Sequence, residues 1–189
     1  MYGYFPCRSD GDDMIIFDPD DHAYPVQRFT SPRQELKRRM CISDFLRARD
    51  TGEVDVIGMH CVTVGHDVSQ RACNLFESDA YQEYLSLHGT GVECAEALAE
   101  LWHPRMRQEL GIAGDDAPNT RGLFKQQYQG SRYSFGYRAC PNMADQQQLF
   151  ALLMPGRIGC TLTENWQIEP EQSTSAIIVH HPQAKYFTV

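Results

Sequence analysis

The segment from Val54 to Val64 constrains the fold of this chain more than any other. It is rich in β-branched residues, and a glycine lies close to each of its ends. Such a run is typical of a strand that is buried within a sheet. The sequence therefore predicts that this segment forms part of the sheet around which the rest of the chain packs.

A second pattern, Val92 to Leu110, predicts a helix that covers this sheet. Its apolar residues at helical spacing are Leu98, Leu101, Trp102 and Met106. Glu and Arg occupy other positions, and Gly111 follows the last turn, as is typical of a helix end. Pro104 complicates the interpretation, because an interior proline removes a hydrogen bond and kinks or ends a helix.

The remaining segments predict mixed secondary structure without a repeating strand–helix unit. We expect a β-hairpin around the turn-forming Asp18–Asp21, further strands, a helical region after Gly65, and two later helices. The hairpin strands are expected at Met14–Phe17 and His22–Phe29. The further strands are expected at Ile158–Thr163 and Ser173–His180. The two later helices are expected at Gly122–Tyr128 and in a segment from Asn142 to Pro155. The predicted class is α+β, in a single domain.

Composition excludes several classes of protein. The 189 residues suit one domain of ordinary core size, and 42% hydrophobic with 22% charged residues is typical of a folded globular protein. The longest strictly apolar run, Leu149–Met154, is far shorter than the roughly 20 residues that span a bilayer. The first residues lack the pattern of a secretory signal, so we expect a cytoplasmic location and no membrane contact. A net charge of −8, with Lys37–Arg39 as the only basic cluster, argues against nucleic-acid binding.

The seven cysteines are odd in number and never form a Cys-x-x-Cys pair. The spacing indicates neither a disulfide framework nor a zinc site, so we expect reduced thiols, several of them buried. Cys140, paired with His180 or His181, is the one candidate for a thiol nucleophile. Adjacent strand residues point to opposite faces, which disfavours a metal site at these two histidines. We predict no metal site and no catalytic side chain.

The run from Tyr128 to Pro141 (YQGSRYSFGYRACP) points most directly to function. It places an arginine, a glycine and paired aromatic residues outside any clear helical or strand period, which favours a ligand-binding loop. With a later Leu-Thr-Glu at 162–164 and the segment His181–Tyr186, this run resembles the activation domain of cobalamin-dependent methionine synthase. The resemblance implies a mostly antiparallel, twisted central sheet with flanking helices.

It also implies a binding site for S-adenosylmethionine, with residues assigned to each end of the ligand. The guanidinium of Arg132 can grip the ligand carboxylate through two parallel donors. Gly136 permits close backbone approach, so that the backbone near Ser134 and Tyr137 reads the adenine. Two acids are candidates for the ammonium group, Glu96 and Asp13, with Asp12 as a weaker alternative. Tyr186 matches a tyrosine that the family places near the ligand.

The function implied is positioning rather than proton transfer. The domain would present the methyl donor to a cobalamin held by a separate domain, after a flavodoxin-like reductase supplies an electron, and so support reductive methylation. The isolated chain would not turn over. Family members usually carry proline at Arg138 and continue beyond both ends of this chain, so we expect a truncated activation-like domain over 1–189. A cation at Arg138 is expected to weaken binding of a sulfonium. The alternative is a non-catalytic docking module that has lost ligand binding.

Overall fold

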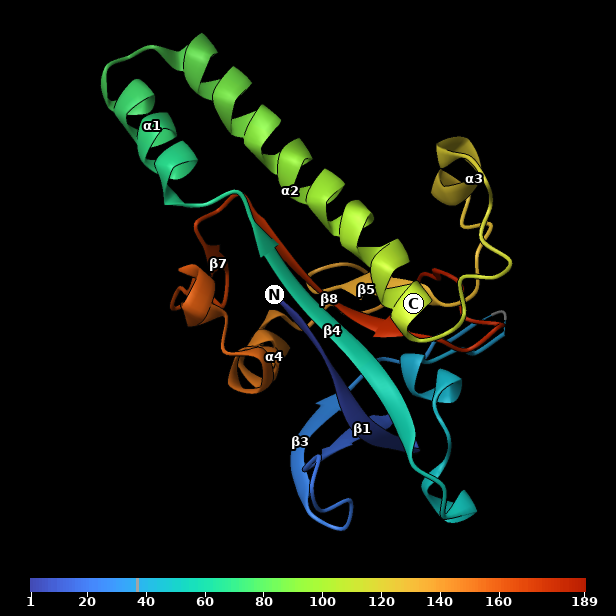
Figure 1. Ribbon diagram of the computed structural model, residues 1–189. Helices are drawn as coiled ribbons and strands as arrows, with labels where there is room; N and C mark the ends of the chain where they lie inside the picture. Colours follow the sequence, from blue (N-terminus) through green and yellow to red (C-terminus); the bar gives the residue numbers. More distant parts are fainter. Residues whose placement is uncertain (37) are drawn as a thin grey trace.

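In the computed structural model, which describes residues 1–36 and 38–189, the chain folds around one six-stranded antiparallel sheet (Figure 1). Lys37, part of the basic cluster noted above, lies outside the described residues. The strand order is β3-β2-β1-β4-β8-β5, and every neighbouring pair is antiparallel. The strands are β1 Tyr2–Asp10, β2 Asp13–Phe17, β3 Pro25–Thr30, β4 Asp55–Thr63, β5 Ser131–Ser134 and β8 Ser173–Val179. The predicted α+β class with a mostly antiparallel sheet is confirmed.

Four α-helices accompany the sheet among the described residues: α1 His66–Glu77, α2 Tyr81–Glu109, α3 Thr120–Phe124 and α4 Gln146–Leu153. The shorter elements are the 3-10 helices Ile42–Phe45, Arg49–Thr51, Met143–Asp145 and Pro155–Ile158, and the two-stranded ribbon of β6 Thr161–Leu162 and β7 Ile168–Glu169. Helices α1 and α2 form a hairpin whose tip extends beyond the sheet (Figure 1). Within the described part of the chain, no helix combines the length and the apolarity needed to cross a membrane.

The two faces of the sheet are covered by different helices. A Cβ added at Gly58 on β4 would lie 3.0 Å from Met106 of α2, whereas one added at Gly3 on β1 would lie 3.2 Å from Leu153 of α4. Gly3 is paired with Met59, the neighbour of Gly58, and side chains alternate between faces along a strand. Helix α2 therefore covers the face of Gly58, and α4 covers the opposite face, where most of the apolar core lies.

Helix α2 packs largely through small residues that were not predicted, together with the predicted Met106. It starts earlier, at Tyr81, and continues through Pro104 to Glu109. Leu101 is half exposed, and the buried residues of the helix are Gly91, Ala95, Ala99, His103, Met106 and Arg107. Small residues four positions apart form a narrow stripe that lets the helix backbone approach the sheet. Of the large apolar residues in the prediction, Met106 is buried and Leu98 and Trp102 are partly buried, so the prediction is wrong chiefly for Leu101 and in omitting the small residues.

Other elements were predicted with mixed success. The hairpin is confirmed as β2 and β3, and the buried strand as β4. Strand β1 was not predicted. Pro6 lies inside it, and proline normally argues against a strand that pairs with a neighbouring strand on each side, as β1 does with β2 and β4. The strand expected over Ile158–Thr163 is wrong beyond Thr161–Leu162, since Pro155–Ile158 forms a 3-10 helix.

The segment interpreted as a ligand loop begins as a strand. Ser131–Ser134 is β5, which pairs with β8 at one edge of the sheet, and a turn follows over Phe135–Cys140. Lys185 and Tyr186 follow a turn at Pro182–Gln183 and lie in an irregular segment. This segment and β5 gather residues from distant parts of the sequence at one edge of the sheet.

Candidate functional site

A cavity of about 380 Å³ lies where β5, α2 and the C-terminal segment meet. It is lined by Glu96, Glu100, Gln126, Tyr128, Arg132, Ser134, Tyr137 and Tyr186. Its volume falls within the range of about 300–1,000 Å³ that small-molecule sites occupy. Five of the seven residues predicted from the sequence therefore line one cavity.

Arg132 is held in this cavity by two acids of α2. Its Nη2 atom donates to Glu96 Oε2 at 3.1 Å and to Glu100 Oε1 at 2.9 Å. The two glutamates are one helical turn apart, so both project toward the same guanidinium. Its Nη1 atom is buried and has no hydrogen-bond partner among the described residues. One nitrogen of the guanidinium is thus engaged twice, while the other has no partner among the described residues.

The strand register explains why Arg132 points into the cavity. Arg132 pairs with Ile178 of β8, which in turn pairs with Gly58 of β4, so Arg132 projects from the face that α2 covers. Ser134 projects from the same face two positions later. The site acids reach these residues because the small-residue stripe of α2 brings its backbone close to the sheet.

Two buried imidazoles lie on the same face as Arg132. His60 on β4 and His103 on α2 are fully buried, and their ring nitrogens have no hydrogen-bond partner among the described residues. Burial lowers the pKa of His60 to about 3, and the Arg132 cation adds to that effect. Burial and the cation of Arg107 lower the pKa of His103 in the same direction. Both rings are therefore neutral near pH 7.

Tyr128 forms a cavity wall and lies against two cations. The guanidinium of Arg107 lies 4.0 Å from the Tyr128 ring centroid, and the ammonium of Lys185 lies 5.6 Å from it. Arg107 is almost fully buried and pairs with Asp116 at 2.6 Å. Lys185 Nζ also donates to the carbonyls of Gln126 and Tyr128 at 2.8 and 2.7 Å. These contacts hold the C-terminal segment against the wall of the cavity.

Gly136 shapes the turn without lining the cavity. Its φ is +82°, and an added Cβ would lie 2.7 Å from Met143 Sδ. Its N–H donates to the carbonyl of Cys140 at 2.9 Å, which closes the turn that carries Tyr137. Only glycine adopts this conformation readily at so close an approach. The predicted importance of Gly136 thus has a conformational basis.

Tyr186 is supported from behind by a stack of aromatic rings. Tyr133 lies 6.3 Å from Tyr186 and 6.4 Å from Phe45 between ring centroids, and both pairs are stacked. Phe45 belongs to the 3-10 helix Ile42–Phe45, which reaches the core from the loop after β3. The position of that loop therefore affects the position of Tyr186 in the cavity wall, through Phe45 and Tyr133.

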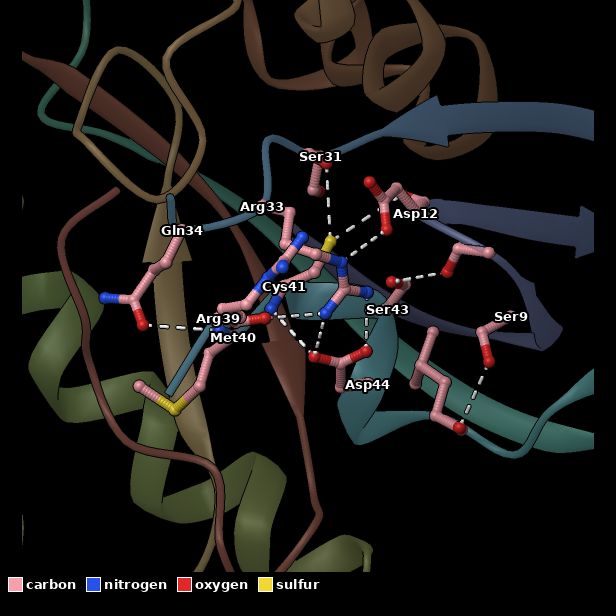
Figure 2. A network of polar contacts seen from close by, with 12 residues as sticks. Ser9, Asp12, Ser31, Arg33, Gln34, Arg39, Met40, Cys41, Ser43 and Asp44 are labelled. Carbon is pink, nitrogen blue, oxygen red and sulfur yellow. Dashed lines mark hydrogen bonds and ion pairs between the residues drawn. The ribbon is translucent and has the colours of Figure 1, made fainter. Parts of the chain in front are cut away.

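A network of ion pairs fixes this loop. Figure 2 shows the guanidinium of Arg33 between Asp12 and Asp44. Arg33 donates to both Asp44 oxygens at 2.7 and 2.8 Å, and to Asp12 at 2.7 Å. Burial raises the pKa of Asp44, but the hydrogen bonds from Arg33 and from the backbone of Cys41 outweigh it and leave the pKa lowered. The carboxylate is thus charged and holds the loop through most of the accessible pH range.

Asp13 does not join the site, which corrects the prediction for this residue. It lies on β2, separated from β5 by the strands β1, β4 and β8. Its carboxylate accepts a hydrogen bond from the Thr30 hydroxyl at 2.6 Å and pairs with Arg28, and these contacts lower its pKa. Asp12 is engaged by Arg33. Both acids belong to the β-hairpin and its loop, and neither faces the cavity.

Sequence reasoning missed three of the cavity residues. Glu100 follows Glu96 by one helical turn, a spacing that signals a shared face. Tyr128 opens the run from which the function was inferred, yet it was not assigned a role. Gln126 gave no signal, because its exposure to the cavity depends on a positive φ of 54°.

The alternative of a thiol nucleophile finds no support. Cys140 is buried, and burial raises its pKa to about 12. His180 Nε2 donates to Asp55 at 2.7 Å, and His181 Nδ1 accepts the backbone N–H of Gln183. Neither imidazole pairs with the thiol. Across the residues that the structure describes, no group of three or more His, Cys, Asp or Glu is placed to hold a metal ion.

Comparison with known proteins identifies the family. A family model described as the activation domain of vitamin B12-dependent methionine synthase matches residues 1–189. The chain belongs to this family. This activation domain is 46% identical over 200 residues to methionine synthase of Mycobacterium tuberculosis and 44% identical to that of Mycobacterium leprae. The match covers the whole domain but 17% of each relative.

A solved structure shows the same architecture. The activation domain superposes with a TM-score of 0.91 and 27% identity on a crystal structure of a MetH reactivation domain bound to AdoHcy. The superposition covers 99% of this chain and 59% of that one. The family and fold inferred from the sequence are therefore confirmed, and the docking-only alternative is not favoured.

Proposed function

We propose that this activation domain binds S-adenosylmethionine in the cavity beside β5 and positions its methyl group for reductive methylation of oxidised cobalamin. The observation that carries the proposal is the arrangement at Arg132, where a buried, unpaired guanidinium donor lies beside two glutamates in a cavity with aromatic walls. The structurally similar MetH domain was crystallised with AdoHcy, the demethylated form of this ligand, which supports the choice.

The donor set fits each charged group of the ligand. We assign Arg132 Nη1 as the donor to the ligand carboxylate, because no described residue accepts a hydrogen bond from it. Glu96 and Glu100 supply two negative charges for the ammonium and the cationic sulfonium. Tyr137 and Tyr186 are about half exposed at the cavity edge and offer flat faces for the adenine.

The side chains of this domain bind and orient rather than transfer protons. S-adenosylmethionine, when bound, supplies a methyl group on a sulfonium that is already a good leaving group. The cavity residues are therefore required to fix the direction of that methyl group and to keep the ligand in place. The fixed wall at Tyr128 and the turn at Gly136 serve this purpose, because neither can shift without breaking several contacts.

Methyl transfer itself belongs to a longer protein. The chain spans about 17% of the length of its curated relatives, so we propose that the cobalamin is held by a separate domain and that the isolated chain does not turn over. Four points remain predictions. They are a flavodoxin-like reductase as electron donor, a cytoplasmic location, the absence of nucleic-acid binding and the absence of membrane binding. Arg138 is exposed and does not line the cavity, so it is not expected to weaken binding strongly.

Calorimetric titration of the purified domain with S-adenosylmethionine tests the proposal. Saturable binding is expected, and Arg132→Ala should weaken it at least tenfold, because a charge-assisted hydrogen bond contributes roughly 1.5–3 kcal/mol. Arg157→Ala removes an exposed arginine outside the cavity and should leave affinity unchanged. A folded wild-type sample that does not bind millimolar ligand, or an Arg132→Ala variant that binds normally, would overturn the proposal.

A further inference from the structure

A second cavity, of about 420 Å³, lies between the α1–α2 hairpin and the segment Glu169–Gln172, which begins at the end of β7 (Figure 1). Its volume, like that of the cavity at Arg132, falls within the range of about 300–1,000 Å³ that small-molecule sites occupy. The two cavities share no lining residue. They are therefore separate sites, and the second has no part in the function proposed above.

A buried glutamine joins the walls of this second cavity. Gln172 has a relative exposure of 1%, and its amide lies between Ser69 of α1 and His88 of α2. The Ser69 hydroxyl donates to Gln172 Oε1, and Gln172 Nε2 lies 3.0 Å from His88 Nδ1. Since an amide nitrogen only donates, Nδ1 is the acceptor and the ring proton of His88 lies on Nε2. Hydrogen bonds thus fix the three walls relative to one another, and His88 is uncharged in this arrangement.

Aromatic rings form the apolar part of the cavity. Phe76 of α1 and Tyr84 of α2 lie 5.2 Å apart between ring centroids, with an angle of 64° between their planes. Tyr84 also stacks on His88 at 5.6 Å. Phe76 is 58% exposed, so the protein leaves part of its ring uncovered. Two rings at such an angle can contact one ligand from two sides, and their π faces attract an organic ammonium ion.

The charged side chains of the lining are acidic. Glu169 and Glu171 both border the cavity and are exposed, and among the described residues no arginine or lysine lines it. Glu171 Oε2 lies 3.7 Å from His88 Nδ1. That nitrogen accepts a hydrogen bond from Gln172, so it carries no proton with which to pair the carboxylate. The cavity thus combines aromatic walls with a surplus of negative charge, which favours a cation over an anion.

We propose that this cavity binds a small organic cation, an ammonium group carried on an apolar or aromatic body. The body packs against Phe76 and Tyr84, and the ammonium group lies toward Glu171. An anion is disfavoured by the two glutamates, and a neutral molecule of the same shape lacks the attraction to both the acids and the rings.

Three compounds with one aromatic body and different charges test the proposal: phenethylammonium, 2-phenylethanol and phenylacetate. They are titrated at pH 7 into the ¹⁵N-labelled domain, and binding is followed by NMR. Phenethylammonium should give saturable shifts in the millimolar range, centred on the amides of Ser69, Phe76, His88 and Glu171. It should bind at least about fivefold more tightly than 2-phenylethanol, as expected for one cation–π contact, and phenylacetate should bind most weakly. Absence of saturable shifts, or equal binding of the three compounds, would overturn the proposal.

Two variants with matched controls locate the site. Phe76→Ala removes a half-exposed ring and should weaken phenethylammonium binding about fivefold, whereas Tyr24→Ala, at an exposed tyrosine of the β2–β3 turn, should leave it unchanged. Glu171→Gln keeps the shape of the side chain and removes its charge, so it should also weaken binding. Glu164→Gln, at an exposed acid outside the cavity, should bind as wild type does. Normal affinity in both Phe76→Ala and Glu171→Gln would refute the assignment of this cavity.

Competition with S-adenosylhomocysteine distinguishes the two cavities. Saturating S-adenosylhomocysteine should not displace phenethylammonium, because the lining residues differ. Displacement, or shifts centred on Arg132 and Tyr137, would place the cation in the cavity beside β5 and overturn the proposal. If S-adenosylhomocysteine itself does not bind, the proposed function fails, and the Phe76→Ala and Glu171→Gln variants still decide this inference.

Discussion

The charged residues that line the cavity carry a net negative charge. Among the described residues, Arg132 is the one cation of the lining, and Glu96 and Glu100 both contact its Nη2 atom. The surplus of acid favours a ligand with a cationic group, and the unpaired Nη1 atom is the donor that we propose for an anionic group. A zwitterion with a further positive centre, such as S-adenosylmethionine, matches this arrangement better than a simple anion does.

The acid charges can be tested with a matched pair on one helix. Glu96→Gln keeps the shape of the side chain and removes its charge, so affinity for S-adenosylmethionine should fall by about tenfold, as for loss of one charge-assisted interaction. Glu93→Gln, an exposed position on the same helix, should bind as wild type does. Titration calorimetry measures both variants. Equal affinity for all three proteins would show that Glu96 does not face the ligand.

The buried imidazoles predict how stability depends on pH. The folded-state pKa of His60, about 3, lies below its ordinary value of about 6.5. The contribution of the neutral ring to the unfolding free energy is thus complete above pH 6.5. It is lost as pH falls, because only the unfolded chain then takes up the proton. Each such imidazole should cost about 1.4 kcal/mol of unfolding free energy per pH unit below 6.5.

Urea unfolding at pH 7 and pH 5 measures this loss. His60→Phe removes one of the two titrating rings and should reduce the difference in unfolding free energy between the two pH values by about 2 kcal/mol. His22→Ala, an exposed histidine in the β2–β3 turn, should leave that difference unchanged. A His60→Phe variant with the same pH dependence as wild type would place the effect elsewhere.

Among the elements, α2 links the fold to the site. Its stripe of Gly91, Ala95 and Ala99 lets the helix lie close to its neighbours, and Glu96 and Glu100 follow the two alanines directly. The distance of the helix from the sheet therefore sets the distance of both acids from Arg132. A side chain that lifts the helix should disturb the site without touching it.

Two glycines of α2 separate packing from helix propensity. A Cβ at Gly91 would lie 2.7 Å from Gln172 Cγ and 3.1 Å from Val68 Cγ1, whereas one at Gly89 would meet nothing within 4 Å. Gly91→Ala should therefore lower the unfolding free energy by about 1–3 kcal/mol through overpacking. Gly89→Ala should raise it by up to about 1 kcal/mol, since alanine favours helix. Urea titration decides the matter, and stabilisation by both substitutions would refute the packing argument.

The elements also show where sequence reasoning succeeds. Strand β4 and the β2–β3 hairpin were predicted because each is specified by local pattern and turn residues. The packing face of α2 was not, because small residues carry little hydrophobic signal and owe their burial to a close approach of backbones. Strand β1 was missed because Pro6 contradicts a local rule that its sheet neighbours override.

The site followed a similar division. Arg132, Ser134, Gly136 and Tyr137 were assigned together because they lie in one short run of sequence, and three of them line the cavity while Gly136 shapes the turn. Tyr186 and Glu96 came from the family resemblance, and the structure brings both to the same cavity. Asp13 lies far from the cavity because three strands separate β2 from β5, and that separation is decided by strand order and not by local sequence.

The two faces of the sheet differ in character. The α2 face carries the charged cavity at Arg132, and the α4 face carries most of the apolar core. An antiparallel sheet permits this because its side chains alternate between faces. The proposed ligand site depends on how helix α2, the edge strand β5 and the C-terminal segment meet.

A crystal structure of the domain grown with S-adenosylhomocysteine tests this account most directly. The account predicts the ligand in the cavity beside β5, with its carboxylate within hydrogen-bond distance of Arg132 Nη1 and its amino group near Glu96 or Glu100. Ligand density elsewhere on the molecule, or a carboxylate that avoids Arg132 while the cavity is occupied, would contradict it.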